Sequence, residues 1–396
     1  MEEMMMDVQQ RGLLTLVRSG LTGEALPLPE GFDSERAYPE LVRHQVLALG
    51  YLGAVNCGLS RKDPVVGKLF QAYCKSLDHS EKQQKLVEAI CAAFDRAGVD
   101  YMPLKGCNMK GLYPAPELRA MGDADILIRV EQYDRIKSVL PELGFVEKLE
   151  SDHELVWRHS DLMLELHKRL IPSYNKDYYR YFGDGWQLAT INSGTRWAMK
   201  REDELVYLFT HFAKHYRDGG IGLRHLADLW VFLRAYPEVD TNHVRSELET
   251  LQLVEFYDNV MKTVKVWFGE GEWDEVSCFI MNRICGSGAY GTREDHDVSA
   301  VVREAGTTGT IAGTRRTRAL RMVFLPYAEM KKKHPSLDKL PVLLPVFWVA
   351  RIFKVLLFRR DQLKRTTHQF RTASTRAASQ YRQELDYVGL KFDFEE

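Results

Sequence analysis

The segment GDADIL (residues 122–127) places two acidic residues two positions apart at the start of an apolar stretch. In a β-strand, residues i and i+2 point to the same face, so Asp123 and Asp125 are expected to project together. Two carboxylates held that close repel each other unless a positive charge lies between them. Carboxylate oxygens suit Mg²⁺, which also retains water and substrate phosphates, so Mg²⁺ or Mn²⁺ is the natural partner. The alternative for an isolated D-x-D motif is a solvated turn in which two acids happen to precede a strand.

A third acid lies on a later stretch that alternates in the same way. Residues 162–167 read LMLELH, which places three leucines on one face of a strand and Met163, Glu165 and His167 on the other. An unpaired carboxylate inside a buried strand is costly. If this strand neighbours that of Asp123 and Asp125, three carboxylates converge, which is enough to hold two metal ions for phosphoryl displacement. The alternative for Glu165 alone is an edge-strand glutamate that faces water.

The run PLKG (residues 103–106) is expected to end a strand that turns into a helix. Glycine lets the backbone approach a ligand closely, and the exposed N–H groups at a helix start favour phosphate. Lys105 or Arg119 would add a positive charge there. Strand-to-helix turns also contain glycine for steric reasons alone, and the run does not match the G-x-x-x-x-G-K-[ST] phosphate-binding loop.

A helical stretch further along the chain supplies a second group of polar side chains, namely His211, His215, Arg224 and Asp228. His211 and His215 share a helix face at spacing i, i+4, which is compatible with zinc, but the spacing indicates no third ligand. The alternatives are a structural histidine pair or a pair that faces the substrate or nucleotide. Arg224 and Asp228 are also four residues apart, so they either pair with each other or face the substrate.

The elements expected around these residues alternate between helices and strands. A helix is predicted at 80–97, with Ser80 and Gln83 as its capping box and Gly98 at its end. The predicted strands are 99–104, 124–130, 145–149, 154–159 and 162–168, and the helices between them are 107–112 and 131–143. This order predicts an α/β or α+β domain with a mixed sheet. The expected domains are an N-terminal helical segment (1–79), this core (80–200) and a C-terminal helical domain (201–396).

Three C-terminal stretches have distinctive compositions. Residues 286–316 are rich in Gly and Thr and are expected to form a loop. Residues 340–358 are apolar, but two prolines and two charges interrupt them, so a buried or interfacial helix is predicted instead of a membrane span. Peripheral membrane contact through residues 340–360 is a further option. The basic tail (359–382) is expected to be moderately helical, with a solvated helix face favoured over contact with RNA or anionic lipid.

The overall composition narrows the class of protein. The chain has 396 residues, of which 45% are hydrophobic and 28% charged, and these globular values exclude wholesale disorder and fibrous architectures. Its net charge of −1 argues against a general nucleic-acid binder. The six cysteines are dispersed without a C-x-x-C pair and the N-terminus does not resemble a secretory signal, so we expect a cytoplasmic protein with reduced thiols.

Three stretches together resemble a known family: LKGCNMKGLYPAPELRAMGDADILI (104–128), LMLELHKRL (162–170) and HFAKHYRDGGIGLRHLADLW (211–230). They are similar to the uncharacterised bacterial nucleotidyltransferase family of the DNA polymerase β-like nucleotidyltransferase superfamily. The similarity covers roughly residues 85–235. It implies that Gly106 is the glycine of a strand–helix turn, that Asp123 and Asp125 are paired metal ligands, and that Glu165 is the third carboxylate. Cys107 departs from the Ser or Gly that the superfamily prefers, which puts a hydroxyl contact to the triphosphate in doubt.

The resemblance implies a polymerase β-like core that transfers an NMP group from an NTP, first of all ATP, to an acceptor hydroxyl with release of pyrophosphate. Mg²⁺ or Mn²⁺ on Asp123 and Asp125 would bind the triphosphate, and a second ion shared with Glu165 would lower the pKa of the acceptor hydroxyl. Glu165 could equally act as the base. The expected nucleotide contacts are Lys105, Gly106, Arg119 and Gly122.

The acceptor is the part of the reaction on which the resemblance is silent. A small metabolite or a protein side chain is favoured over nucleic acid because the net charge is close to zero. The cleft between the core and the helical domain would select it. The alternative function is that of a non-catalytic nucleotide-binding or interaction protein that has kept the fold.

Overall fold

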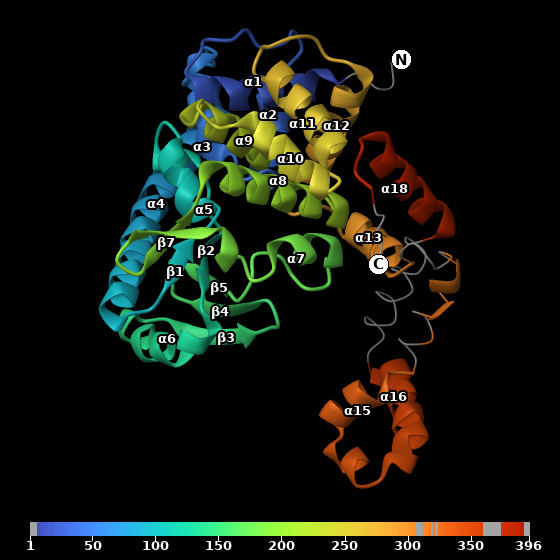
Figure 1. Ribbon diagram of the computed structural model, residues 1–396. Helices are drawn as coiled ribbons and strands as arrows, with labels where there is room; N and C mark the ends of the chain where they lie inside the picture. Colours follow the sequence, from blue (N-terminus) through green and yellow to red (C-terminus); the bar gives the residue numbers. More distant parts are fainter. Residues whose placement is uncertain are drawn as a thin grey trace. The chain divides into compact units, whose positions relative to one another are not determined.

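The computed structural model describes residues 6–305, 310, 312–314, 316–317, 320, 324–358 and 374–391 (Figure 1). By their contacts these residues form two compact units. The first comprises the described residues up to Tyr216 together with Gly220–Tyr290, and the second comprises Arg217–Gly219 with the described residues from Gly291 onward. The residues singled out for chemistry all lie in the first unit. The domain limits 1–79, 80–200 and 201–396 stay a prediction.

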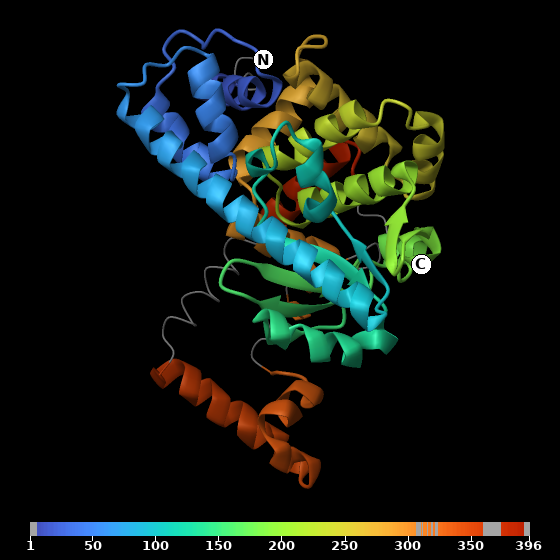
Figure 2. The same cartoon turned by 90° about the vertical axis from the view of Figure 1, so that its left-hand side faces the viewer.

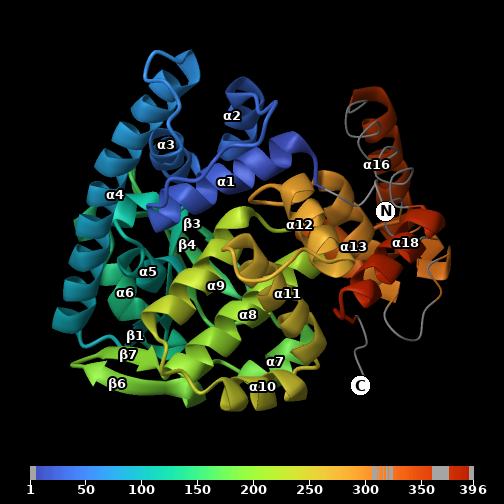
Figure 3. The same ribbon diagram turned by 90° about the horizontal axis from the view of Figure 1, so that it is seen from above.

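The N-terminal segment of the first unit is helical, as the sequence predicts. Helices α1 (Val8–Thr22), α2 (Ser34–Arg43) and α3 (Leu47–Asn56) pack on one another, and α2 and α3 also contact α4 (Pro64–Ala97) (Figure 3). The Asp63 side chain accepts a hydrogen bond from the N–H of Val65 and so caps the start of α4, where proline occupies the first turn. Gly98 ends the helix in the left-handed conformation, with a φ of 64°.

The predicted helix start at Ser80 is wrong, because α4 runs uninterrupted from Pro64 to Ala97. Ser80 and Gln83, which were expected to form the capping box, lie in the middle of this helix, and both side chains are buried in the protein. The amide of Gln83 donates to the carbonyl of Met121 at 2.9 Å, and its oxygen accepts from Lys110 at 3.3 Å. Gln83 therefore links α4 to the segment before Asp123 through hydrogen bonds and does not cap a helix.

The core of the first unit is a seven-stranded mixed sheet with the order β3-β4-β5-β2-β1-β7-β6. Its strands are β1 (Tyr101–Pro103), β2 (Asp123–Ile128), β3 (Val146–Glu150), β4 (Glu154–Arg158), β5 (Met163–His167), β6 (Ala189–Ser193) and β7 (Arg196–Met199). β2 runs parallel to β5 and β1 parallel to β7, while the other neighbours are antiparallel. The five strands expected from the sequence are confirmed to within two residues at each end. The hairpin of β6 and β7 was not predicted.

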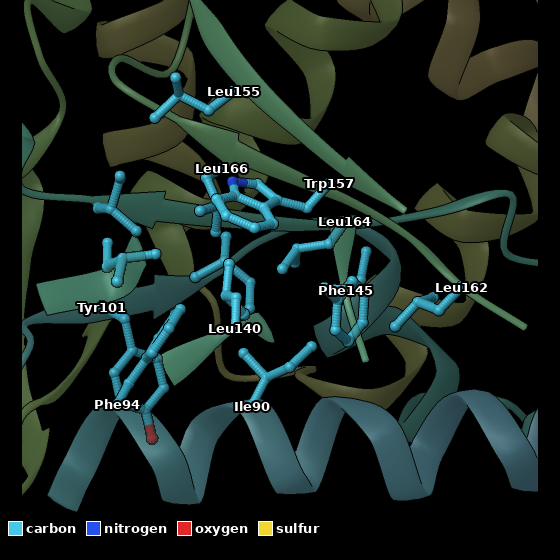
Figure 4. Packing of buried hydrophobic residues seen from close by; sticks show 14 of the residues in the cluster. Ile90, Phe94, Tyr101, Leu140, Phe145, Leu155, Trp157, Leu162, Leu164 and Leu166 are labelled. Atoms are coloured by element: carbon cyan, nitrogen blue, oxygen red, sulfur yellow. The ribbon is translucent and has the colours of Figure 1, made fainter. Parts of the chain in front are cut away.

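One face of the sheet is covered by α4 and α6 (Tyr133–Val139), as Figure 2 shows. Ile90 and Phe94 of α4 pack with Leu164 and Leu166 of β5 in a cluster that excludes water (Figure 4). Each fully buried leucine or isoleucine of this kind contributes roughly 1.5–3 kcal/mol. A slip of β5 by one residue would turn Glu165 into the cluster, so the burial of the leucines fixes the register of the strand.

Helices dominate the remainder of the first unit, as predicted. Two short helices, α5 (Gly106–Met109) and α7 (Lys176–Phe182), accompany the sheet. The helical region then consists of α8 (Arg201–Asp218), α9 (Leu223–Ala235), α10 (Thr241–Thr250), α11 (Val254–Trp267) and α12 (Glu275–Ser287). Buried aromatic rings fill its interior, including Phe209, Phe212 and Phe256, whose ring centroids lie 5.6 to 6.0 Å apart.

The second unit contains α13 (Arg293–Ala305), α15 (Tyr327–Lys333), α16 (Leu344–Phe358) and α18 (Thr375–Tyr387), with α13 packed on α18. The expectation of a loop throughout residues 286–316 is wrong, because α13 lies inside it. The Thr292 hydroxyl accepts from the N–H of Asp295 at 3.0 Å and caps this helix. Residues 306–309, 311 and 315 of that stretch, and the part of the basic tail from 359 to 373, lie outside the described residues.

The apolar stretch 340–358 contains α16, as predicted. Several of its large apolar side chains are exposed, among them Val342, Val346, Val349 and Phe353. Among the residues that the structure describes, no helix combines the length and the apolar character needed to cross a membrane. A peripheral membrane contact stays a prediction.

A buried histidine joins the N-terminal helices to the helical region of the first unit. His44, at the end of α2, lies 3.2 Å through Nε2 from the carbonyl of Cys285 in α12, and its Nδ1 accepts from the N–H of Leu223 in α9 at 3.3 Å. Burial, reinforced by the positive charge of Arg43, lowers the pKa of His44 to about 4. The folded protein therefore holds this imidazole neutral, whereas the unfolded chain takes up a proton as the pH falls below about 6.5.

We expect the wild type to lose on the order of 3 kcal/mol more stability than His44→Gln between pH 7 and pH 4. At neutral pH the variant should be the less stable protein, because two buried hydrogen bonds are disturbed. Urea denaturation at a series of pH values measures both quantities. Other histidines with lowered pKa are common to both proteins and cancel in the difference. Equal slopes of stability against pH would contradict this account of His44.

Candidate active site

The three predicted carboxylates lie on one face of two neighbouring strands. β2 and β5 are parallel, with Asp125 paired in register with Glu165 and Asp123 with Met163. Residues in register on adjacent strands share a face, and Asp123 lies two positions before Asp125. The side chains of Asp123, Asp125 and Glu165 therefore project together. The residues that alternate with them, such as Leu164 and Leu166, belong to the core cluster, so the carboxylates lie on the opposite face of the sheet.

Asp125 lies at the centre of a buried charge network. Its Oδ1 is 2.8 Å from Nζ of Lys105 and 2.7 Å from Nε2 of His167, and only 4% of the residue is exposed. Burial alone would raise the pKa of Asp125, but the Lys105 ammonium and the bond from His167 outweigh it and hold the pKa well below its usual range. Burial would likewise lower the pKa of Lys105, and the Asp125 carboxylate holds it above its usual value.

Glu165 and Asp123 carry charges that are less well compensated. Oε2 of Glu165 lies 3.9 Å from Nε2 of His167, which is beyond hydrogen-bond distance. Burial, followed by the charges of Asp123 and Asp125, raises the pKa of Glu165 to about 8. Burial and the charge of Asp125 also raise the pKa of Asp123. Such carboxylates are stabilised by an added cation, because a positive charge between them removes the repulsion.

This donor set fits divalent cations. Ligand atoms of Asp125, Glu165 and His167 lie within 4.8 Å of one another, close enough for small side-chain rotations to bring them onto one ion. Asp123 adds a further carboxylate on the same face. Carboxylate oxygens are the preferred ligands of Mg²⁺ and Mn²⁺, and imidazole nitrogen is accepted by Mn²⁺ but disfavoured by Mg²⁺.

The turn from β1 into α5 holds Lys105 against Asp125. Lys105 has a φ of 42°, a conformation that is uncommon for a residue with a side chain and is found mainly where surrounding structure enforces it. The N–H of Leu104 donates to the backbone carbonyl of Asp125 at 2.9 Å, which fastens the turn to β2. A Cβ on Gly106 would lie 2.8 Å from Nη1 of Arg119 and 3.0 Å from the side chain of Met121, so a larger residue would have to displace these side chains.

Arg224 and Gly122 lie beside Asp123. Arg224 of α9 donates to the carbonyl of Ala120 at 2.7 Å, and its positive charge opposes the rise in the pKa of Asp123. Gly122 is exposed immediately before Asp123, and a Cβ there would lie 3.3 Å from the hydroxyl of Tyr290. Arg224, one of the four polar residues singled out in the helical stretch, thus lies close to the carboxylate of Asp123.

The predicted alternative of a pair between Arg224 and Asp228 is wrong. Asp228 accepts two hydrogen bonds of 2.9 Å each from Nε and Nη2 of Arg119, and a third of 2.7 Å from the hydroxyl of Tyr113. Arg119 and Asp228 are both almost fully buried. Because its guanidinium is engaged in this pair, Arg119 is positioned to hold the segment before β2 against α9. Its contact with a nucleotide stays a prediction.

The two histidines on α8 face each other. Nε2 of His215 lies 3.0 Å from Nε2 of His211, so their predicted common helix face is confirmed. Burial, followed by the nearby charge of Lys105, lowers the pKa of His211 well below its usual value. Neither residue belongs to the groups of potential metal ligands among the described residues. Their role toward the substrate stays a prediction, whereas the proximity of His211 to Lys105 places α8 beside the carboxylate face.

A cavity of about 230 Å³ opens on this same side of the sheet. Met102 of β1 lines it and pairs in register with Leu127 of β2, which lies two positions after Asp125 on the same face. Its other lining residues include Lys105, Asn108, Trp197, Glu204, Tyr207 and Tyr236. The cavity therefore lies one strand away from the carboxylates, between the sheet and the first helices of the helical region.

Tyr207 connects this cavity with the charge network. It is almost fully buried, and its hydroxyl lies beside the Lys105 ammonium without forming a well-aligned hydrogen bond to any described residue. Burial raises the pKa of Tyr207 to about 12, although the neighbouring Lys105 acts in the opposite direction. A buried hydroxyl without a partner is costly, and a bound ligand would satisfy it.

Two residues of the site were not assigned a role from the sequence. The alternation of residues 162–167 placed His167 on the same face as Glu165, and that spacing was the signal for it. Tyr207 gave no comparable signal, because an aromatic residue on a helix most often belongs to the core.

Comparison with known proteins identifies the family of the chain. The model of the uncharacterised nucleotidyltransferase family matches residues 30–269, more than half of the chain, and the chain belongs to this family. Together with the mixed sheet, this membership confirms the predicted α/β nucleotidyltransferase fold class. A solution structure of the antibiotic-resistance factor ANT(2'')-Ia is similar over 42% of this chain and 90% of its own, with 13% sequence identity and a TM-score of 0.32. No curated protein matches the chain.

The two aspartates should respond differently to loss of charge. Asp125→Asn leaves the buried Lys105 ammonium without its carboxylate, so we expect a loss of about 3–5 kcal/mol of stability. Asp123→Asn removes a charge that burial disfavours, so the variant should be at least as stable as the wild type. Urea denaturation in buffer without divalent cations measures the difference.

The double variant Asp125→Asn/Lys105→Met is the matched control, because it removes both charges of the pair. It should recover a large part of the lost stability. An Asp125→Asn protein as stable as the wild type would mean that the pair with Lys105 is not the buried interaction described above.

Proposed function

We propose that this protein transfers an NMP group from an NTP, with ATP as the first candidate, to an acceptor hydroxyl and releases pyrophosphate. The observation that carries this proposal is the pairing of Asp125 with Glu165 in register on parallel strands, with Asp123 on the same face. Three carboxylates on one face of two neighbouring strands, next to a lysine, match the requirements of metal-assisted phosphoryl transfer. Family membership supports the same class of reaction.

The chemistry of the donor set supports Mg²⁺ or Mn²⁺ as the cofactor. When bound by Asp123, Asp125 and Glu165, divalent cations would neutralise the triphosphate and make the acceptor hydroxyl more acidic. The protein contributes by holding these carboxylates in place. Lys105 and His167 hold Asp125, and the apolar residues of β2 and β5 that pack into the core cluster hold the two strands.

The remaining roles belong to side chains that lie on the carboxylate face. Lys105 supplies a buried ammonium that would hold phosphate oxygens as pyrophosphate leaves. In the reaction the acceptor oxygen bonds to the α-phosphorus, the bond from that phosphorus to the bridging oxygen of the β-phosphate breaks, and the hydroxyl proton leaves. Burial and the neighbouring carboxylates raise the pKa of Glu165, so once a bound cation has displaced its own proton, Glu165 is suited to accept the proton of the acceptor hydroxyl. The alternative role of Glu165 is that of a metal ligand.

We propose further that the cavity between the sheet and α8 receives a substrate group. It adjoins Lys105, and the buried hydroxyl of Tyr207 forms no well-aligned hydrogen bond to any described residue. Its lining combines aromatic rings with amide, carboxylate and cationic groups, as in sites for small hydroxylated molecules. A small metabolite, or the side chain of a protein, is the acceptor class that this volume and the net charge of −1 favour.

Pyrophosphate release tests the proposed reaction. We expect release from an NTP with Mg²⁺ or Mn²⁺ when cell metabolite or protein fractions are supplied as acceptors. Asp123→Asn and Glu165→Gln should each lower it by about a hundredfold or more, because each removes charge at the reacting phosphate. The control is Glu150→Gln, which removes an exposed carboxylate from the edge strand β3 and should leave the rate unchanged.

Unchanged release in Asp123→Asn would exclude the proposed metal-assisted reaction. Thermal stabilisation of the wild type by ATP and Mg²⁺, without any pyrophosphate release from all NTPs and fractions, would favour the alternative of a non-catalytic nucleotide-binding protein. The two outcomes are distinguishable because ligand binding and turnover are measured separately.

Tyr207→Phe tests the cavity. The variant should be about as stable as the wild type, because it removes a buried hydroxyl that forms no well-aligned hydrogen bond in the described structure. Its kcat/KM for pyrophosphate release should fall roughly tenfold, which corresponds to one lost hydrogen bond to a substrate. Lower stability with unchanged kcat/KM would show that the hydroxyl serves the fold and not the substrate.

A further inference from the structure

His167 lies on the carboxylate face of β5, and the proposed reaction does not use its side chain directly. It is the last residue of β5, two positions after Glu165, and 2% of it is exposed. Its Nε2 lies between two carboxylates, 2.7 Å from Oδ1 of Asp125 and 3.9 Å from Oε2 of Glu165. Asp125, Glu165 and His167 each offer one potential metal-ligand atom, and these three atoms all lie within 4.8 Å of one another.

The second nitrogen of this imidazole has a partner of its own. Nδ1 of His167 lies 3.2 Å from Nε2 of His153, and the two rings meet edge to face. His153 is held in place because its backbone carbonyl accepts from the N–H of Lys168 at 2.9 Å. Histidines that bind metals through one ring nitrogen usually form a hydrogen bond to a neighbour through the other, which fixes the ring and its tautomer.

We propose that His167 is a direct nitrogen ligand of the divalent cation held by Asp125 and Glu165, and that the site thereby selects Mn²⁺ or a similar transition-metal ion over Mg²⁺. This inference rests on the proposed metal-assisted function and goes beyond it by adding a ligand and a choice of metal. When Nε2 binds the ion, the neutral imidazole of His167 carries its single N–H proton on Nδ1. This N–H then donates a hydrogen bond to Nε2 of His153. Imidazole nitrogen favours first-row transition metals, whereas Mg²⁺ prefers an all-oxygen shell.

Electron spin echo spectroscopy of the full-length protein loaded with Mn²⁺ tests the ligand directly. We expect echo modulation from a nitrogen bound to Mn²⁺, which changes when the protein is labelled with ¹⁵N-histidine. The modulation should disappear in His167→Gln and persist in His153→Gln, the matched control, because His153 touches the imidazole and not the ion. Absence of histidine nitrogen coupling in the Mn²⁺-loaded wild type would overturn the proposal.

Calorimetric titration with Mn²⁺ and Mg²⁺ provides the second measurement. His167→Gln should weaken Mn²⁺ binding roughly tenfold or more and Mg²⁺ binding much less. Equal losses for the two ions would show that His167 only orients Asp125, and would also overturn the proposal. These measurements need no turnover: nitrogen coupling in a protein that releases no pyrophosphate would leave this inference standing and remove only the proposed reaction.

Discussion

The convergence of three carboxylates on one face of β2 and β5 is the constraint on which the rest of this structure depends. Without a bound cation, the carboxylates of Asp123, Asp125 and Glu165 repel one another at a site with little access to water. Burial and this repulsion together raise the pKa of Glu165. The ammonium of Lys105 compensates part of this negative charge. The turn that gives Lys105 its positive φ also places this ammonium against the Asp125 carboxylate. A surplus of negative charge remains, and a divalent cation between the carboxylates would neutralise it.

The opposite face of the same strands supplies the rigidity that such a site needs. Leu164 and Leu166 of β5 point into the cluster under α4, so each residue between and beside them must point to the carboxylate face. Catalytic groups must be held closely to their productive positions, and side chains on packed strands are held more tightly than side chains on loops. The buried pair of Arg119 and Asp228 extends this support by joining the segment before β2 to α9.

Much of this arrangement could be predicted from the sequence where the information is local. The i, i+2 spacing placed Asp123 with Asp125, and the alternation around Glu165 gave its face without any knowledge of the fold. What the spacing could not provide was the parallel pairing of β2 with β5, since nothing in either strand specifies its neighbour. Long-range partners were missed for the same reason: the sequence suggested Arg224 as the partner of Asp228, whereas Arg119 lies far from it along the chain. Ser80 and Gln83 satisfied the pattern of a helix cap, but tertiary contacts of Gln83 and the cap at Asp63 overrode it.

The central claim is that Asp123, Asp125 and Glu165 jointly hold the ions that bind the substrate triphosphate. A crystal structure of the protein with Mn²⁺ and a non-hydrolysable NTP, with anomalous scattering used to locate the metal, tests it most directly. The account predicts Mn²⁺ at about 2.1 Å from oxygens of these carboxylates, with phosphate oxygens on the same ions. Metal and triphosphate bound elsewhere, with the three carboxylates free of both, would contradict it.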